Sequence, residues 1–329
     1  MPWRHSQTAA VQRPYLERWC DIGDNRRCLA PRRRITLSQS GLRSSVTLGK
    51  TQVIGGECAM RIVITGGNSG IGKATAASFA AAGHHVLIAC RTIDKAERAA
   101  AEMEGDVEVR HLDLADLRTV RSFADSLEAV DVLVNNAGVF GLPLSRTADG
   151  FEGHMGINHL GHFALTCLLG DKIKDRVISV TSGSHMLGRL HLDDLNWHTR
   201  KYSTWAAYAE SKLATMLFVH ELASRGVRAY NTDPGATATD ISRDSAGLMH
   251  WAYKHDLMRF GVKGAERGAR TSIEAVTTDL PSGAYIAPRF INWGAPVHTR
   301  RRKYARDPEV ARSLWQRSAE LTGCDLPRR

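Results

Sequence analysis

A tyrosine and a lysine four residues apart, Tyr208 and Lys212, are the pair in this sequence best suited to acid–base chemistry. Residues four positions apart share one face of a helix, and the stretch 204–224 around them is helix-like. A free phenol has a pKa near about 10, and a neighbouring ammonium lowers it toward the useful range. We therefore predict that Lys212 lowers the pKa of Tyr208, although such a pair alone also occurs on many solvated helix faces.

A glycine-rich segment at residues 65–72 (TGGNSGIG) offers a place for the phosphates of a cofactor. Glycines at a strand-to-helix turn let backbone N–H groups approach an anion at a helix N-terminus. The spacing is GxxxGxG, and Ala74 stands where a P-loop needs a hydroxyl. Cofactor binding is favoured over a turn that only packs helix on strand. The expected contact residues are Gly66, Asn68, Ser69, Gly70, Ile71 and Gly72.

The end of the second strand indicates which dinucleotide is bound. An acidic residue there would hold the ribose of NAD, whereas an arginine would accept a 2′-phosphate. Residues 85–90 are followed by Arg91, and the first carboxylate comes only at Asp94. We therefore expect NADP(H), with NAD(H) less favoured. After the third strand, Asp113 could accept from an adenine amino group, while Asp116 fits a helix N-cap better.

Strand-like and helix-like stretches alternate from residue 61 onward. Strands are predicted at 61–65, 85–90, 107–112, 131–134, 176–181 and 227–232, and helices at 72–82, 94–104, 156–169 and 204–224. Continuous apolar strands that alternate with helices predict a parallel sheet covered on both faces. The expected fold class is therefore α/β, a single-domain Rossmann-type doubly wound parallel sheet.

The first 59 residues differ from the rest in charge. They hold ten basic and four acidic side chains, a net of +6, whereas residues 60–329 hold 34 and 30, a net of +4. The nearly neutral body argues against nucleic-acid binding. We expect residues 1–59 to be a disordered extension, or to be untranslated if synthesis starts at Met60, and residues 60–329 to form the catalytic domain. A targeting or nucleic-acid-binding arm is the alternative.

Composition also argues against membrane and metal functions. No run approaches the roughly 18 apolar residues of a membrane span. The six cysteines include no CxxC pair, which favours the reducing cytoplasm and no zinc site. His154, His159 and His162 lack an accompanying pattern of carboxylate ligands, so we expect no metal.

Several motifs together resemble the short-chain dehydrogenase/reductase family, specifically its retinol dehydrogenase-like branch. The resemblance covers nearly all of residues 60–329 and depends on motifs that occur in the family's order and spacing. They are TGGNSGIG at 65–72, ACR at 89–91, LDL at 112–114, NNAG at 135–138, TADGFEGHMGINHLGHFALT at 147–166, SVTSGSH at 179–185, YAESK at 208–212 and DPG at 233–235.

The resemblance implies a role for each matching residue. Tyr208 would exchange a proton with the substrate, Lys212 would bind the nicotinamide ribose, and Ser182 would hold the reacting oxygen beside Tyr208. Asn158 would hold a water in a proton relay behind Lys212. The implied cofactor contacts beyond the glycine turn and Arg91 are Asp113, Leu114, Asn136, Ala137, Gly138, Tyr208, Lys212, Pro234, Gly235 and Thr239.

The chain departs from the family pattern at two positions. Thr181 stands where many members have a second serine, and Asp233 stands where many have histidine. We expect neither change to touch the reacting atoms.

Two apolar segments are placed to choose the substrate. The 25 residues between Ser182 and Tyr208, and residues 241–260, follow predicted strands and carry many apolar side chains. Loops at the carboxyl ends of parallel strands form ligand sites in this fold, so a bulky apolar carbonyl or alcohol is predicted. Packing onto the domain or a partner is an equal alternative.

The implied function is NADP(H)-dependent interconversion of a carbonyl and an alcohol by hydride transfer, with Tyr208 as general acid/base. One alternative is a catalytically idle NADP(H)-binding regulator. A nucleotide-sugar epimerase is less favoured, because only 94 residues follow Gly235. We expect a small-molecule substrate, no nucleic-acid partner, a cytoplasmic location, and a homo-oligomer paired through the helices around 157–169 and 204–224.

Overall fold

The computed structural model describes residues 53–54, 57–235, 264–290 and 293–327. Thr239, the apolar segment 241–260 and most of residues 1–59 therefore lie outside the described residues. A short antiparallel pair, β1 (Val53–Ile54) and β2 (Glu57–Cys58), precedes Met60. Regular structure thus begins inside the segment that the sequence assigned to the N-terminal extension.

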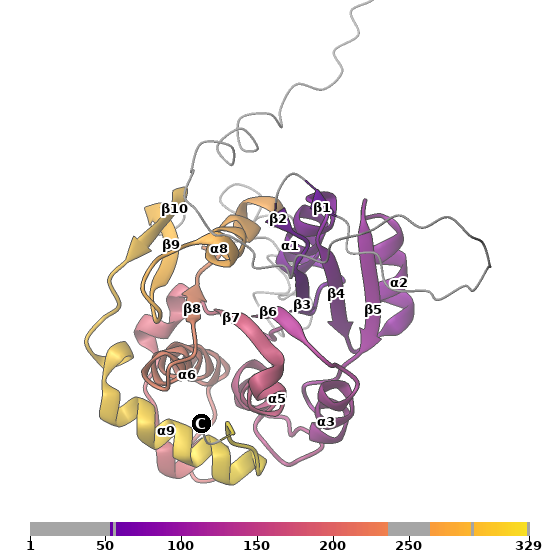
Figure 1. Cartoon of the computed structure of the whole chain (residues 1–329). Helices are drawn as coiled ribbons and strands as arrows, with labels where there is room; N and C mark the ends of the chain where they lie inside the picture. The colour runs from indigo at the N-terminus through magenta and orange to yellow at the C-terminus, as the bar shows by residue number, and fades with distance from the viewer. Residues whose placement is uncertain (1–52, 55–56, 236–263, 291–292, 328–329) are drawn as a thin grey trace, which may run out of the picture. The chain divides into compact units, whose positions relative to one another are not determined.

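Eight strands form one sheet in the order β10-β9-β8-β7-β6-β3-β4-β5 (Figure 1). Their bounds are β3 Arg61–Thr65, β4 His85–Cys90, β5 Asp106–His111, β6 Val130–Asn135, β7 Ile173–Val180, β8 Ala229–Thr232, β9 Tyr285–Phe290 and β10 Trp293–Thr299. Every neighbouring pair from β5 to β9 is parallel, but β9 and β10 pair antiparallel.

The predicted parallel sheet is confirmed from β5 to β9, and it ends in an antiparallel edge formed by β9 and β10. Each of these two strands contains a proline, Pro288 in β9 and Pro296 in β10. Proline has no N–H to donate and weakens the sequence signal of a strand, yet it is tolerated near a sheet edge. The pattern of residues 285–299 therefore gave no indication of these two strands.

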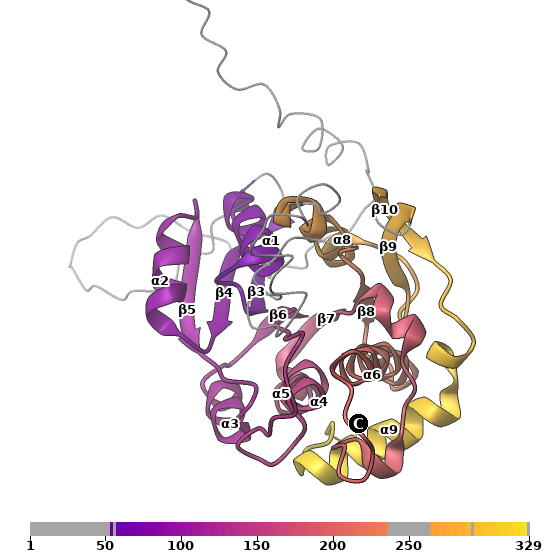
Figure 2. The same ribbon diagram turned by 180° about the vertical axis from the view of Figure 1, so that it is seen from behind.

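Helices cover both faces of the sheet. Their bounds are α1 Gly70–Ala81, α2 Ile93–Ala101, α3 Leu117–Asp125, α4 Gly153–Met155, α5 Gly161–Leu169, α6 Thr204–Ser224, α8 Ala265–Thr277 and α9 Pro308–Thr322. In Figures 1 and 2, α3, α5 and α6 lie on one face and α1, α2 and α8 on the other. The unpredicted helix α9 packs against α6 and α5.

Alternating side chains of the central strands explain the two layers. Val63 of β3 and Leu133 of β6 belong to the apolar cluster under α3, α5 and α6, whereas Ile62 and Ile64 belong to the cluster under α1 and α8. Successive side chains of a strand point to opposite faces, so a strand buried on both faces must be apolar throughout. This pattern confirms the doubly wound architecture.

The strand order reverses between β3 and β6. From β3 the chain adds β4 and β5 on one side, and then crosses back to add β6, β7, β8 and β9 on the other. In such sheets the crevice outside the carboxyl ends of the strands at the reversal is where ligands bind. The segments that follow β3, β6, β7 and β8 all begin at this edge.

Candidate active site

The turn between β3 and α1 requires glycine at several positions. Gly66 and Gly70 have φ values of +67° and +53°, in the left-handed region. A Cβ on Gly72 would lie 2.4 Å from both the Gly66 carbonyl oxygen and the Asn136 Nδ2. The close contact shows why only glycine fits where α1 begins.

The N-terminus of α1 remains open to an anion. The N-cap residue Ser69 makes no side-chain capping hydrogen bond, and the first turn contains no acidic residue. Helix N-termini that lack such partners present free N–H groups and a positive dipole end. These groups fit the pyrophosphate of a dinucleotide. Asn68, Ser69, Gly70 and Ile71 are half-buried in this turn.

A hydrogen-bond hub at Thr65 joins the glycine turn to the segment after β6. Thr65 Oγ1 accepts from the backbone N–H groups of Asn136 and Ala137, each at 2.9 Å. The same oxygen lies 2.9 Å from His162 Nε2, and His162 Nδ1 lies 3.1 Å from the Asn158 carbonyl oxygen. That carbonyl only accepts, so Nδ1 carries the proton and the Thr65 hydroxyl donates to Nε2. Burial lowers the pKa of His162 to about 4 and keeps it neutral.

Tyr208 and Lys212 lie on α6 and are both buried. Lys212 Nζ donates to the Val180 carbonyl oxygen at 3.0 Å and lies 5.8 Å from the centre of the Tyr208 ring. Burial raises the pKa of Tyr208 to about 12 and lowers that of Lys212 to about 8. The net shift of the Tyr208 pKa is therefore upward in the protein alone, because loss of solvation outweighs the favourable contacts of the phenolate. The lowering contributed by Lys212 stays a prediction.

Two serine hydroxyls stand next to Tyr208. Ser182 follows β7 and begins a 3-10 turn, Gly183–Leu187, where its side chain accepts from the Ser184 N–H at 3.3 Å. The nearby side chains of Ser182 and Ser184 lower the pKa of Tyr208, against the larger effect of burial. The structure thus brings Ser182 to Tyr208 as predicted. Ser184 was missed, although its Ser-x-Ser spacing after a strand end was a usable signal.

The side chain of Asn158 makes three hydrogen bonds. Its Oδ1 accepts from Val139 N at 2.8 Å, and its Nδ2 donates to Val139 O at 3.1 Å and to Ser211 Oγ at 3.0 Å. Both Nδ2 hydrogens are used, so a relay water would have to donate to a carbonyl oxygen of Asn158, and this predicted contact stays a prediction. Asn158 also lies in a π-helical turn, Gly156–Leu160, between α4 and α5, so the single helix predicted over 156–169 is interrupted.

The other predicted cofactor residues line the same edge of the sheet. Arg91 follows β4 and is exposed, and among the described residues no hydrogen bond or ion pair engages it. Asp113 Oδ1 accepts from Ala115 N at 3.0 Å, while Asp116 caps α3, as expected. Leu114 is buried, and Asn136, Ala137, Gly138, Pro234 and Gly235 are half-buried.

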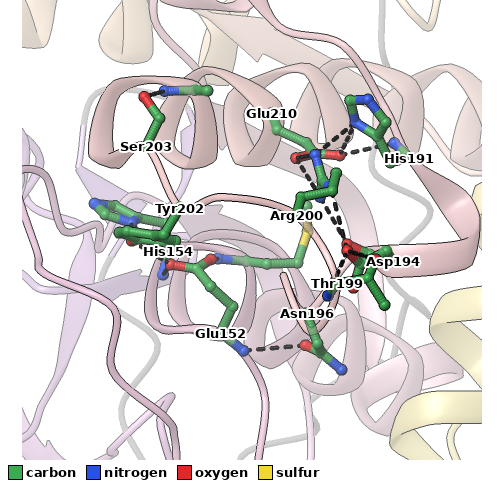
Figure 3. A network of polar contacts seen from close by, with 12 residues as sticks. Glu152, His154, His191, Asp194, Asn196, Thr199, Arg200, Tyr202, Ser203 and Glu210 are labelled. Atoms are coloured by element: carbon green, nitrogen blue, oxygen red, sulfur yellow. Dashed lines mark hydrogen bonds and ion pairs between the residues drawn. The ribbon is translucent and has the colours of Figure 1, made fainter.

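The insert between Ser182 and Tyr208 is tied to α6 through the buried Glu210 (Figure 3). Glu210 Oε1 accepts from His191 N at 2.7 Å, and Glu210 Oε2 lies 3.2 Å from Arg200 Nη2. Arg200 also pairs with Asp194 at 3.2 Å and lies over the Trp197 ring at 3.8 Å. These contacts therefore fix the insert to α6, the helix that carries Tyr208.

A second buried cluster joins the insert to α4. Glu152 is fully buried, and its Oε1 accepts from the Tyr202 hydroxyl at 2.9 Å and lies 3.0 Å from His154 Nδ1 (Figure 3). The ring of His154 in turn lies 6.1 Å from that of Tyr208.

The three histidines considered as metal ligands in the sequence bind to different partners. His154 contacts Glu152, His159 lies 2.8 Å from Ser318 Oγ, and His162 contacts Thr65. Within the described ranges no group of three or more metal-ligating side chains occurs.

Comparison with known proteins decides the family. The family model described as short chain dehydrogenase matches residues 60–247. The chain belongs to the short-chain dehydrogenase/reductase family. It is 39% identical over 321 residues to retinol dehydrogenase 13 of Homo sapiens. This match covers 86% of the present chain and 92% of the relative. The chain is 41% identical over 283 residues to retinol dehydrogenase 12 of Mus musculus, which covers 80% and 86%.

A solved structure of similar sequence has the same fold. A crystallised protein of Mycobacterium paratuberculosis is 41% identical, with a TM-score of 0.72, and the match covers 82% of this chain and 95% of that one. This short-chain dehydrogenase/reductase is thus an oxidoreductase of the retinol dehydrogenase-like branch, which uses a nicotinamide dinucleotide and acts on CH–OH and carbonyl groups of small molecules. Its described residues include no helix that is both long and apolar enough to cross a bilayer.

The Thr65 hub yields a first prediction. Thr65→Val removes the acceptor of two backbone N–H groups and the donor to a buried histidine, so it should lower the free energy of unfolding by about 1–3 kcal/mol. It should also weaken binding of the dinucleotide, because Asn136 and Ala137 lose their anchor. Denaturant unfolding and cofactor titration measure the two effects.

Thr75→Val is the matched control for Thr65→Val. Thr75 is equally buried, but its hydroxyl only donates to the Ile71 carbonyl within α1. Equal losses of stability in the two variants, with unchanged cofactor affinity, would contradict the role given to the hub.

Proposed function

We propose that the protein reduces an aldehyde or ketone with NADPH, and catalyses the reverse alcohol oxidation, with Tyr208 as the general acid/base. The observation that carries the proposal is the grouping of Ser182, Tyr208 and Lys212 at the edge of the sheet where α1 also begins. Tyr208 and Lys212 are 9% and 3% exposed, so their protons are exchanged in a largely dry site. Low solvation strengthens each electrostatic contact there.

Each side chain of the group has a distinct task in this proposal. Tyr208 donates its proton to the substrate oxygen during reduction and takes it back during oxidation. Ser182 donates a hydrogen bond to the same oxygen, and Lys212, which uses one N–H on Val180, has donors left for the ribose hydroxyls. The bound nicotinamide supplies or accepts the hydride at the substrate carbon. Asn158 acts through its main chain, since its side chain holds Val139.

The electrostatics of Tyr208 favour reduction at neutral pH. A pKa raised to about 12 keeps the phenol protonated, which is the form that gives a proton to a carbonyl oxygen. Alcohol oxidation needs the phenolate, which burial disfavours. The reverse reaction is therefore expected to gain rate as the pH rises.

Arg91 supports the choice of NADP(H). It stands at the carboxyl end of β4, where the 2′ position of an adenosine ribose is read in this fold, and it is exposed. A guanidinium that has no hydrogen-bond or ion-pair partner among the described residues is suited to a phosphate monoester. The proposed cofactor contacts are the glycine-turn residues, Arg91, Asp113, Leu114, Asn136, Ala137, Gly138, Tyr208, Lys212, Pro234 and Gly235; Thr239, outside the described residues, stays in the set as a sequence-based prediction.

An aromatic pair supports a bulky apolar substrate. The Phe140 ring lies edge-on to both Tyr208, at 4.7 Å, and Trp205, at 4.9 Å. Trp205 is 55% exposed, and Leu144, Met186 and Leu187 are also exposed on the neighbouring segments. Exposed apolar side chains next to a catalytic group are typical of a binding surface. The relatives named retinol dehydrogenase make a lipid-like alcohol or aldehyde a natural first substrate to assay.

The remaining sequence-based expectations are carried as proposals. We propose that the catalytic domain corresponds to residues 60–329 and acts in the cytoplasm. The helix pair expected to join two copies is covered in part by α9, whose Trp315 lies 4.9 Å from Phe163 and stacks on Phe218 at 5.8 Å. The pairing of two copies through these helices stays a prediction.

Replacement of the tyrosine tests the catalytic role. Tyr208→Phe should lower the rate of carbonyl reduction by about 10²–10⁴-fold, because the proton donor is lost while the ring is kept. NADPH oxidation with a panel of carbonyls measures the rate, and NADPH fluorescence should report unchanged binding. Retained turnover would defeat the mechanism, whereas absence of turnover in the unaltered enzyme across the panel would favour an idle NADP(H)-binding regulator.

Arg91→Ala tests the cofactor preference. Loss of a charge-assisted phosphate contact should raise the KM for NADPH by about 10–100-fold and leave that for NADH nearly unchanged. Steady-state kinetics with both cofactors provide the measurement. Arg312→Ala, an exposed arginine on α9, should alter neither value. A strong preference for NADH in the unaltered enzyme would refute the role of Arg91.

Trp205→Ala tests the apolar wall. The loss of a large aromatic surface should lower kcat/KM for a bulky apolar carbonyl by about tenfold, mainly through KM. A short-chain carbonyl that does not reach Trp205 should be unaffected. Phe290→Ala, which removes an exposed ring at the end of β9, is the control. An equal loss for both carbonyl sizes would place Trp205 outside the substrate site.

A further inference from the structure

Asp233 is a buried carboxylate at the carboxyl end of β8. It is 5% exposed. Its Oδ1 accepts from the Gly235 N–H at 2.8 Å, and its Oδ2 accepts from the Tyr285 hydroxyl at 2.8 Å. Both partners are donors, which is the arrangement that suits an ionised carboxylate. Over the described part of the chain, no basic side chain forms an ion pair with it.

The sheet places this carboxylate beside the catalytic group. Val180 of β7 is paired with Thr232 of β8, and the Thr181 N–H donates to the Thr232 carbonyl oxygen at 2.8 Å. Asp233 therefore lies opposite Thr181 on the neighbouring strand end, and Ser182 is the next residue along the chain from Thr181. A Cβ on Gly183 would lie only 3.6 Å from Asp233 Oδ2. The acceptor of the Lys212 ammonium, the Val180 carbonyl, belongs to the same pair of strand ends.

The titratable and charged groups around this position come from several elements. Tyr208 is faced by Lys212 on its own helix and by His154 of α4, whose ring lies 6.1 Å away. Asp233 is faced by Tyr285 of β9, and His185 of the 3-10 turn lies 5.5 Å from the Tyr285 ring. Arg302 acts on His185 from the segment after β10.

Asp233 is the carboxylate whose charge acts on both Tyr208 and Lys212. The pKa of His185 is lowered by burial, which leaves it neutral near pH 7. The Asp233 charge raises the pKa of Lys212, opposing the lowering by burial, and it raises the pKa of Tyr208 in addition to burial. The same carboxylate thus acts on both members of the pair in the same direction.

We infer that Asp233 is a positioning residue for the reaction: its carboxylate holds the Pro234–Gly235 turn and places a fixed negative charge that keeps Tyr208 and Lys212 protonated, which favours carbonyl reduction. The inference rests on the proposed function of Tyr208. It assigns a role to one of the two positions where the chain departs from the family pattern, a change that the sequence alone gave no reason to connect with the reacting atoms.

The pH dependence of both directions tests the inference. Asp233→Asn keeps an oxygen for the Gly235 N–H but removes the charge. The alkaline limb of kcat/KM for carbonyl reduction should then move to lower pH by on the order of 1 unit. Alcohol oxidation at pH 7 should rise by about 3- to 10-fold relative to reduction, since the phenolate becomes easier to form. Asp233→Ser, which also keeps an acceptor for Gly235, is the second neutral variant if the Asn variant does not fold.

Two controls separate charge from structure. Asp131→Asn removes a carboxylate that accepts a backbone N–H, from Arg61, at the opposite end of the sheet, and should leave both profiles unchanged. Tyr285→Phe keeps the Asp233 charge, so the alkaline limb should stay in place. Unchanged limbs in a folded neutral Asp233 variant would overturn the inference, as would an equal shift in Tyr285→Phe. Activity that survives Tyr208→Phe would instead refute the proposed function itself.

Discussion

The close approach of the glycine turn to the segment after β6 is the constraint on which the site depends. Gly72 and Asn136 leave no room for a Cβ between them, and Thr65 receives two N–H groups from that segment. Because both contacts cross the point where the strand order reverses, they fix the two walls of the cofactor crevice relative to each other. A side chain at Gly72 would separate the walls, and the open N-terminus of α1 would no longer lie beside β6.

Burial sets the chemistry of the catalytic pair as much as proximity does. Loss of water pushes Tyr208 and Lys212 toward their neutral forms, so the phenol keeps its proton while the ammonium tends to lose its own. Lys212 is held by a carbonyl oxygen and by the field of Asp233, which both favour its charged form. A Tyr-x-x-x-Lys spacing alone therefore does not determine which proton is available, because the answer depends on groups that strands β7, β8 and β9 bring to the pair.

Local sequence signals predicted the parts of the fold that depend on local structure. The helix bounds 204–224 and the strand bounds 61–65 and 85–90 were predicted correctly, because the alternation of apolar strands with helices is strong there. Strands β9 and β10 were missed because Pro288 and Pro296 weaken their pattern. Helix α9 was missed although its sequence carries local helix signals: Asp307 at the N-cap, Pro308 at the first helical position and Gly323, with a φ of +63°, after the last turn.

In the candidate site, too, some contacts could be predicted from sequence motifs and others could not. Motif spacing correctly brought Ser182, Tyr208 and Lys212 together, since each follows or lies on an element with a clear signal. The Thr65–His162 contact spans 97 residues, and the Asp233–Tyr285 contact joins β8 to a strand that the sequence did not reveal. Such contacts depend on tertiary register, and a single sequence carries no local trace of them.

The proposed catalytic residues of helix α6, Tyr208 and Lys212, lie on a different side of the helix from Glu210, which anchors the insert. Residues two apart on a helix do not face each other, so Glu210 points away from the side that Tyr208 and Lys212 share. From there Glu210 holds His191 and Arg200 of the insert. Removal of one member of a buried ion pair leaves the other charge without compensation, which typically costs about 3–5 kcal/mol. Glu210 therefore holds the insert to α6, the helix that carries the proposed proton donor Tyr208. In this way α6 sets the position of the apolar side chains of the insert relative to Tyr208.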